Sequence, residues 1–358
     1  MRAKISVIVP VFNSEQYIEE CLLSVIEQTL SDIEIICVDD GSTDGTAAII
    51  SEYLKKDSRI RYVCIEHSGS GPARNTGIDE SDSEFIAFMD SDDRYPEKNT
   101  LEKLYYHALE NDVQICGGSW SESNGNKIIT TFSDSEYTFK REGIVNYEDY
   151  QFDFGYHRFI YASDLIKKRE IVFPNYLRYQ DPPFFVLAMV SAGKFYSLCE
   201  PTYCRRVKES DPFDTADKIR DLISGFENVL GLADEFGFDN LREKTIGRIT
   251  EHIQLITARV VLSEYSVAIP FFNLYSSTHL SESKKLPSII ILLLADQGIK
   301  NQTIREYIQL WKEGRVKLLP DVKTIYIVHR CIKEKGLKWF FTFCYRSLFK
   351  FIKGIRPL

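Results

Sequence analysis

The chain has 358 residues, of which 44% are hydrophobic, so it can bury a large core and is expected to form more than one domain. Its formal net charge of −8 argues against nucleic acid as a partner, because phosphate backbones attract basic surfaces. The eight cysteines contain no CxxC pair and no spacing typical of zinc ligands, so neither a zinc site nor a disulfide framework is predicted.

The amino-terminal part of the chain alternates between strand-like and helix-like patterns. Apolar, β-rich runs predict strands at residues 5–10, 33–38, 60–65 and 85–89. Apolar positions spaced as on one face of a helix follow the first two runs, at residues 17–26 and 47–54. A glycine-rich connection at residues 67–77 leads into a further short helix before the fourth strand. This order predicts a parallel sheet with right-handed crossovers.

The pattern becomes less regular in the next hundred residues and then purely helical. Helices are predicted at residues 101–109, 163–169 and 184–192, and strands at residues 112–117, 195–198 and 202–207. The polar run at residues 119–126 predicts a turn. Beyond residue 211 the helical patterns lie at residues 219–230, 246–260, 289–296 and 303–311. We therefore expect an α/β domain at residues 1–210 and a helical region at residues 211–358.

Three carboxylates, Asp90, Asp92 and Asp93, follow directly after the strand predicted at residues 85–89. Open α/β sheets bind ligands at the carboxyl ends of their strands, and carboxylates are the ligands that hard divalent cations prefer. An acidic loop that caps the following helix is the alternative that these residues alone leave open.

Two further segments carry polar groups to the same edge of the predicted sheet. Asp40 lies in the Asp-Asp-Gly-Ser run after the second strand, where its carboxylate could accept hydrogen bonds from a base or a ribose. Arg74 lies in the glycine-rich connection, and its guanidinium could hold a diphosphate in a bidentate manner. The alternatives are an ordinary Asp/Gly turn and a surface arginine.

Taken together, four motifs resemble those of family-2 glycosyltransferases with the GT-A fold. They are Val-Pro-Val-Phe-Asn at residues 9–13, Val-Asp-Asp-Gly-Ser-Thr-Asp-Gly-Thr at residues 38–46, Ala-Arg-Asn-Thr-Gly at residues 73–77 and Asp-Ser-Asp-Asp at residues 90–93. The resemblance covers roughly residues 4–210. It implies a Rossmann-like, mostly parallel sheet flanked by helices, followed by a helical extension. It also implies an inverting transfer of a sugar from a nucleotide-diphosphate sugar, most often a UDP-sugar, to a glycan or lipid-linked acceptor, as in bacterial cell-surface polysaccharide synthesis.

The resemblance also implies roles for individual residues. It assigns the donor site to Pro10, Phe12, Asp40, Ser42, Arg74 and Asp90. It implies that Asp92 binds a divalent cation, Mg²⁺ or Mn²⁺, which bridges the two phosphates of the donor. A metal and an arginine are physically suited to this place, because the leaving group gains negative charge as the glycosidic bond breaks.

An inverting transfer also needs a base for the acceptor hydroxyl. In similar enzymes this base is the Asp of a Glu-Asp pair before an apolar helix, and this chain has Gln180-Asp181 there. The resemblance therefore makes Asp181 the base and leaves the role of the missing glutamate vacant. A helix cap ahead of the prolines is the alternative for Asp181. His67 stands where relatives commonly have Asn and receives no role.

His157 and Arg158 fall in a region that lies at the acceptor mouth in similar enzymes. Basic groups there would meet an acidic glycan or a lipid diphosphate, but such residues are equally common in a core or at its rim.

The segment at residues 337–358 is aromatic and basic and contains no acid. Such a helix is typical of one that lies in the interface of an anionic membrane, and a terminal helix packed on the second domain is the open alternative. The amino terminus has no signal-peptide pattern, and no apolar run reaches the ~18–20 residues that cross a bilayer. We expect a cytoplasmic protein, attached to the inner face of the plasma membrane if the segment binds lipid.

Two other functions use similar residues. A nucleotidyltransferase would be expected to have a basic, glycine-rich phosphate loop near the amino terminus, where this chain has Val-Pro-Val-Phe-Asn. A catalytically inactive nucleotide-sugar or glycan-binding module would need neither Asp92 nor Asp181.

Overall fold

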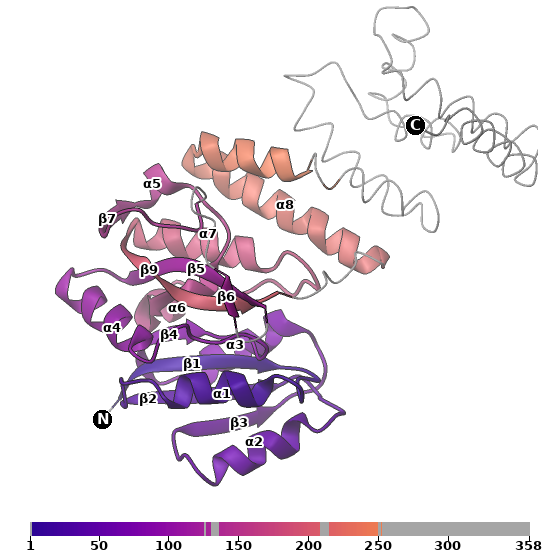
Figure 1. Cartoon of the computed structure of the whole chain (residues 1–358). Helices are drawn as coiled ribbons and strands as arrows, with labels where there is room; N and C mark the ends of the chain where they lie inside the picture. Colours follow the sequence, from indigo (N-terminus) through magenta and orange to yellow (C-terminus); the bar gives the residue numbers. More distant parts are fainter. Residues whose placement is uncertain (1, 125–126, 130–135, 208–214, 250–251, 253–358) are drawn as a thin grey trace, which may run out of the picture. The chain divides into compact units, whose positions relative to one another are not determined.

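The structure is a computed structural model that describes residues 2–124, 127–129, 136–207, 215–249 and 252 (Figure 1). The chain divides into two compact units, Met1–Gly247 and Arg248–Leu358. The helices predicted at residues 289–296 and 303–311, most of the stripe at residues 246–260 and the basic aromatic segment at residues 337–358 lie outside the described residues.

The first unit begins with the predicted alternation of strands and helices. The elements are β1 (Ala3–Val11), α1 (Ile18–Ile26), β2 (Ile33–Asp39), α2 (Thr46–Leu54), β3 (Ile60–Cys64), α3 (Ser70–Glu80) and β4 (Ser83–Phe88). β1 pairs in parallel with both β2 and β4, and β2 pairs in parallel with β3. The predicted parallel sheet is therefore confirmed, and its strands end at one edge.

The remaining strands extend this sheet in mixed directions. The elements are α4 (Thr100–Glu110), β5 (Ile115–Asn124), β6 (Lys127–Ile129), β7 (Gly143–Asn146), α5 (Tyr147–Tyr150), the 3₁₀ helix η1 (Tyr156–Arg158), β8 (Phe159–Ala162), α6 (Ser163–Lys168), α7 (Asp181–Ala192) and β9 (Lys194–Arg206). The strand order is β3-β2-β1-β4-β8-β5-β9-β7, with β6 paired to β5. β8 is antiparallel to both β4 and β5, whereas β5 and β9 are parallel.

Helices cover both faces of the sheet, so the unit has three layers (Figure 1). On one face, Val7 and Val9 of β1 share a core with residues of α1, α2 and α4. On the other face, Ile8 shares a core with residues of α3, α6 and α7. Strands covered on both faces need apolar side chains in both directions, which explains the continuous apolar runs in the sequence.

Two predictions about the mixed part of the sheet were wrong. The polar run at residues 119–126 does not form a turn at its start, because β5 continues to Asn124. Its small hydroxyl side chains are buried and bonded across the sheet: Ser119 Oγ donates to Cys199 O at 2.7 Å, and Ser121 Oγ donates to Tyr203 O at 2.9 Å. The two strands predicted at residues 195–198 and 202–207 are the single strand β9, which continues through Pro201.

The helix α8 (Ala216–Phe236) belongs to the first unit and confirms the stripe predicted at residues 219–230. Its amino terminus is capped by Thr215, whose side chain accepts a hydrogen bond from Lys218 N, and it ends at Gly237 with φ +69°. Val229 and Ala233 pack in the same core as Phe184 and Phe185 of α7. The compact unit therefore continues beyond the boundary expected near residue 210.

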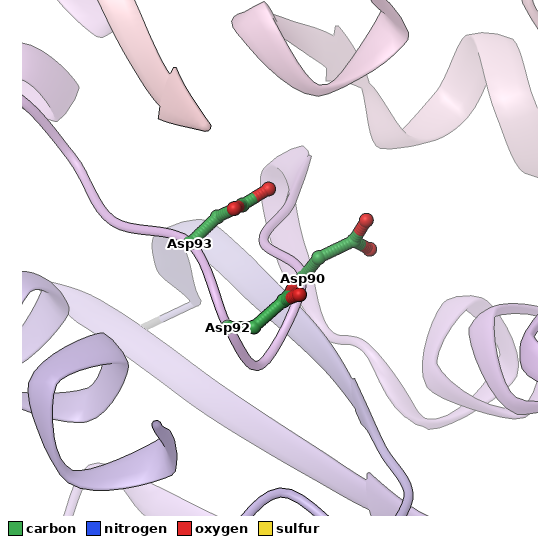
Figure 2. A group of neighbouring side chains, drawn as sticks. All are labelled: Asp90, Asp92 and Asp93. Carbon is green, nitrogen blue, oxygen red and sulfur yellow. The ribbon is translucent and has the colours of Figure 1, made fainter. Parts of the chain in front are cut away.

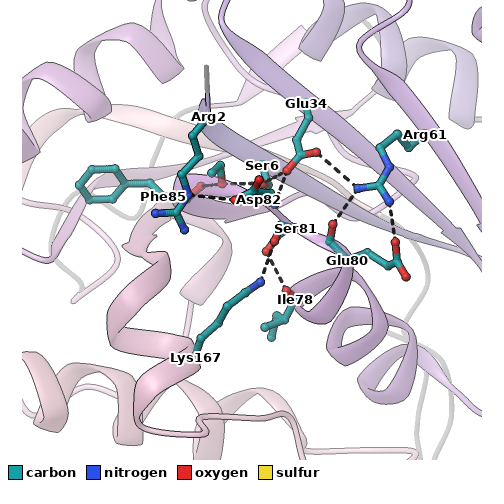
Figure 3. A network of polar contacts seen from close by, with 11 residues as sticks. Arg2, Ser6, Glu34, Arg61, Ile78, Glu80, Ser81, Asp82, Phe85 and Lys167 are labelled. Atoms are coloured by element: carbon teal, nitrogen blue, oxygen red, sulfur yellow. Dashed lines mark hydrogen bonds and ion pairs between the residues drawn. The ribbon is translucent and has the colours of Figure 1, made fainter.

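A polar network joins the amino-terminal ends of β1, β2 and β4 at the edge opposite the motif residues (Figure 3). The Glu34 carboxylate accepts hydrogen bonds from Ser6 Oγ and from Asp82 N, the latter at 2.7 Å, and lies 3.5 Å from Arg61. Arg61 also pairs with Glu80, at the end of α3, at 2.5 Å. We call these residues, Ser6, Glu34, Arg61, Glu80 and Asp82, the amino-edge network.

Candidate active site

A cleft of about 470 Å³ opens at the carboxyl ends of β1, β2 and β4. Its position agrees with the general location of ligands in open α/β sheets. Seven of the predicted site residues line it, namely Pro10, Phe12, Asp40, Arg74, Asp90, Asp92 and Asp181. Ser42, His157 and Arg158 are not among its lining residues.

One end of the cleft carries an aromatic platform. The Phe12 side chain is 45% exposed, and its ring stacks on His67 with a centroid distance of 4.3 Å. His67 Nδ1 lies 2.9 Å from Asp40 Oδ2, so the histidine joins the platform to the carboxylate. Sequence reasoning gave His67 no role, since nothing in a single sequence shows that its ring meets Phe12.

Asp40 is buried beside this platform and organises the connection that follows β3. Its carboxylate accepts hydrogen bonds from Ser68 N at 2.7 Å and from Gly69 N at 2.9 Å. Ser68 Oγ, at 3.3 Å, and His67 Nδ1 approach the same carboxylate, so Asp40 fixes this connection at the place where it lines the cleft. Ser42, by contrast, holds two loops together: its hydroxyl accepts from Asn13 N at 3.0 Å, and its own N donates to Asp39.

Arg74 belongs to α3, which packs closely against β1 and so places this residue in the lining of the cleft. A Cβ on Gly77 of α3 would come within 2.2 Å of Ile8 Cγ2, so only glycine permits this approach. The Arg74 side chain is 4% exposed and faces two carboxylates. It lies 2.8 Å from Asp90 Oδ1 and 3.5 Å from Asp181 Oδ1, with the rings of Tyr156 and Phe173 each 5.3 Å from its guanidinium.

Asp90 lies between Arg74 and His157. His157 Nε2 is 3.0 Å from Asp90 Oδ2, and because a carboxylate only accepts, this nitrogen carries the proton. Burial opposes ionisation of the Asp90 carboxyl, but His157 and Arg74 outweigh it and hold the pKa of Asp90 well below its ordinary value. His157 thus contacts Asp90 without lining the cleft itself, a position that sequence reasoning did not predict.

Some polar atoms beside this group have no protein partner. Among the described residues, His157 Nδ1, Tyr156 Oη and Arg74 Nε are buried and make no hydrogen bond. We call the four charged or titratable residues, Arg74, Asp90, His157 and Asp181, the carboxyl-edge cluster.

Arg158 does not reach the cleft, contrary to the expectation of acceptor contact. Its side chain is fully buried, and its guanidinium donates to the backbone carbonyls of Gly118 at 3.0 Å, Tyr137 at 2.8 Å and Glu136 at 3.1 Å. It also donates to Tyr150 Oη. Arg158 therefore satisfies carbonyls inside the core, which is the alternative that its sequence context had left open.

The three aspartates after β4 occupy one turn of the chain (Figure 2). Asp90, Asp92 and Asp93 each offer an oxygen, and these oxygens lie within 4.8 Å of one another. Asp93 is already engaged by Tyr203 Oη at 2.6 Å and by Arg206 N at 2.7 Å. Burial, together with the neighbouring Asp90 and Asp92, raises the pKa of Asp93 to about 7. An all-oxygen set suits Mg²⁺ or Mn²⁺, and Asp90 and Asp92 are the members that line the cleft.

Asp181 is the first residue of α7 and lines the cleft. Its side chain is 31% exposed. Burial of the carboxyl raises the pKa of Asp181, and Arg74 and His157 only partly oppose this effect. Gln180, which stands where relatives have glutamate, donates through Nε2 to Ser70 Oγ at 2.9 Å and so ties the start of α7 to α3.

Comparisons with known proteins agree with this geometry. The model of glycosyl transferase family 2 matches residues 6–168. The glycosyltransferase GlyG of Streptococcus pneumoniae is 34% identical over 245 residues, which cover 64% of this chain and 80% of that protein. The chain belongs to glycosyltransferase family 2.

Other proteins that this chain resembles are longer or less similar in sequence. The poly(ribitol-phosphate) beta-glucosyltransferase of Bacillus spizizenii is 33% identical over 213 residues, which cover 57% of this chain and 32% of that enzyme. The chain also spans 60% and 20% of two further curated relatives. The crystal structure of S. aureus TarS 1–349 in complex with UDP-GlcNAc superposes with a TM-score of 0.60 at 21% identity, covering 87% of this chain and 92% of that one. This likeness confirms the GT-A fold.

Among the described residues, none of the helices combines the length and the apolar character that a membrane span requires. The segment predicted to bind an anionic membrane, residues 337–358, is not described.

Proposed function

We propose that this glycosyltransferase moves a sugar from a nucleotide-diphosphate sugar to an acceptor hydroxyl with inversion at the anomeric carbon. The observation that carries the proposal is the convergence of Arg74, Asp90, Asp92 and Asp181 on one cleft. They come from three separate segments of the chain, and they supply the positive side chain, the metal ligand and the catalytic base that such a transfer needs.

The donor end of the cleft is the Phe12 side. The exposed Phe12 ring and the stacked His67 offer a flat surface to the nucleobase of the donor. Asp40, which lines the cleft beside them, is the proposed acceptor for the N–H groups of that nucleobase. A UDP-sugar is the donor that we favour, and the TarS complex with UDP-GlcNAc supports this choice by fold likeness.

The diphosphate would lie over Arg74 and Asp92. Asp92 would hold a divalent cation, Mg²⁺ or Mn²⁺, which when bound stabilises negative charge on the departing diphosphate. Arg74 places a buried positive charge beside the same group, with its orientation fixed by Asp90. Because Asp90 is held ionised by His157 and Arg74, it can accept a hydrogen bond from a ribose or sugar hydroxyl.

Asp181 would act as the base. As the acceptor oxygen attacks the anomeric carbon, Asp181 takes the hydroxyl proton and the nucleoside diphosphate leaves with the bonding electrons. A raised pKa improves a carboxylate as a base at neutral pH, because proton affinity increases while the ionised form is still populated.

The acceptor is proposed to be a glycan or lipid-linked glycan of the bacterial cell surface. The named activity of the poly(ribitol-phosphate) relative supports this class. A cytoplasmic location, with residues 337–358 on an anionic membrane surface, remains part of the proposal and depends on their acid-free, basic composition.

Donor turnover tests the proposal most directly. The full chain is incubated with a panel of UDP-sugars and with other nucleotide sugars, and release of nucleoside diphosphate is measured with Mg²⁺, with Mn²⁺ and with chelator. Metal-dependent release with at least one donor is the expected result. Binding of a UDP-sugar without any release, in the presence of lipid-linked or polyol-phosphate acceptors, would favour an inactive binding module.

A further inference from the structure

The loop at residues 174–180 leads directly into Asp181, and we call it the base loop. Leu177 and Arg178 of this loop line the cleft. Its two ends are fixed to α3. At the start, Asn75 exchanges two hydrogen bonds with the backbone of Phe173, at 2.8 and 2.9 Å. At the end, Gln180 reaches Ser70. The middle of the loop has a different support.

That support is α8, which lies beyond the part of the chain that the family motifs cover. Asp221 accepts a hydrogen bond from Leu177 N at 2.8 Å, and Asn228 Nδ2 donates to Tyr176 Oη at 3.0 Å. Between these two contacts, the Tyr179 ring packs on Phe226 with a centroid distance of 4.4 Å. A stretch of about two turns of α8, from Asp221 to Asn228, therefore holds one short loop.

Tyr179 itself has an uncommon backbone conformation, with φ +66° two residues before Asp181. A non-glycine residue in this region is strained and persists only where its surroundings fix it. Gly225 of α8 lies against this residue and leaves no room for a side chain. A Cβ on Gly225 would come within 2.7 Å of Tyr179 Cδ1, 2.8 Å of its carbonyl oxygen and 2.9 Å of its Cβ.

We infer that α8 is a positioning element of the active site, and that the absence of a side chain at Gly225 sets the place of Asp181 through Tyr179. The inference rests on the proposed role of Asp181 as the base. Tyr179 cannot yield to a methyl group without moving its own backbone, because its carbonyl oxygen and Cβ are among the atoms in contact. Gln180 and Asp181 follow at once, so a shift of Tyr179 is passed to the carboxylate.

The same helix contains a matched control. Gly231 of α8 has no atom within 4 Å of the place where its Cβ would lie. Alanine is the better helix former, so Gly231→Ala should raise the melting temperature slightly, whereas Gly225→Ala combines the same change in helix propensity with a methyl group placed against Tyr179. A positioning role separates the two variants: Gly225→Ala loses turnover, whereas Gly231→Ala keeps it.

The experiment uses the full chain with the donor and metal that support nucleoside diphosphate release. We expect Gly225→Ala to lower kcat about tenfold or more while the donor Kd, measured by calorimetry, stays within about threefold, because a displacement near 1 Å can cost up to about 10²-fold in rate. Gly231→Ala should keep kcat within about twofold. A folded Gly225→Ala variant with the kcat of Gly231→Ala would overturn the inference, as would a loss confined to donor affinity.

Two further variants keep the result decisive. If Gly225→Ala does not fold, Asp221→Ala replaces it, since this change removes the acceptor of Leu177 N at a half-buried position. An unchanged kcat would then overturn the inference. Asp181→Asn separates the two levels of the proposal. If Asp181→Asn abolishes turnover and Gly225→Ala does not lower it, only the role of α8 fails. If Asp181→Asn keeps full turnover, the base assignment fails and the inference fails with it.

Discussion

The two edges of one sheet use charged residues in opposite ways. In the amino-edge network, Arg61 pairs with Glu34 and Glu80 (Figure 3). Its side chain is 43% exposed, so water as well as these carboxylates contacts it. In the carboxyl-edge cluster, the Arg74 side chain is 4% exposed and faces Asp90 and Asp181. Beside it, polar atoms of Tyr156 and His157 are buried without a hydrogen bond in the described part of the chain.

This difference shows what each edge does. Exposed ion pairs contribute little to stability, and their loss is tolerated. Buried, incompletely bonded polar groups destabilise a fold, and they persist where a ligand completes them. This contrast supports our proposal that the carboxyl edge, and not the amino edge, is preorganised for charged chemistry. Four changes, ordered by expected effect, test the contrast.

Asp181→Asn should have the largest effect on turnover. Loss of a positioned base lowers kcat by about 10²–10⁴-fold. Donor binding should change little, because the part of the cleft that we propose to hold the nucleobase is formed by Phe12 and Asp40. Steady-state kinetics and calorimetry with the UDP-sugar measure both quantities. A kcat equal to that of the wild type would mean that another group takes the acceptor proton.

Asp92→Asn should lower turnover by roughly 10²-fold, because the variant loses a charged metal ligand worth several kcal/mol of charge stabilisation. Added Mn²⁺ should restore part of the activity, since an amide oxygen still binds a cation weakly. Asp82→Asn, in the amino-edge network, is the control and should turn over normally. Full activity of the wild type in chelator, with no metal detected in the protein, would contradict the assignment.

Asp93→Asn tests the pH dependence of stability in metal-free protein. The folded-state pKa of Asp93, about 7, lies above the ordinary value of a carboxyl, so the folded state binds more protons than the unfolded state between those values. Its contribution to stability is therefore complete at acidic pH and decreases as the pH rises towards 7. The neutral variant should remove this decrease and gain up to about 3 kcal/mol at pH 8. Denaturant unfolding from pH 4 to pH 8 measures it, and parallel curves for both proteins would refute the shift.

Arg61→Ala should have the smallest effect. It removes exposed pairs with Glu34 and Glu80, which are worth about 0.5–1 kcal/mol of stability in total. Because Arg61 lies at the edge opposite the cleft, kcat should not change. A thermal melt and the nucleoside diphosphate assay check the two statements. A large loss of turnover would mean that the two edges are coupled.

The sequence alone determined the parts of this protein that depend on local pattern. Alternating apolar runs and amphipathic helices specified the parallel sheet, since the burial of each strand leaves few other arrangements. The strand order then predicted that Asp40, Arg74 and the acidic turn meet, because the carboxyl ends of parallel strands share one edge. The resemblance to family-2 glycosyltransferases added Pro10, Phe12 and Asp181, which line the same cleft.

Only the tertiary structure decided which side chains meet without a local signal. His157 holds Asp90, and His67 stacks on Phe12, although a lone histidine carries no pattern. Arg158 is basic like any surface residue, yet it is buried against carbonyls of other segments. Ser119 and Ser121 are polar and predicted a turn, but hydrogen bonds across the sheet make them part of β5. The contact of Gly225 with Tyr179 joins residues 46 positions apart in the chain, and long-range packing of this kind has no periodicity in sequence.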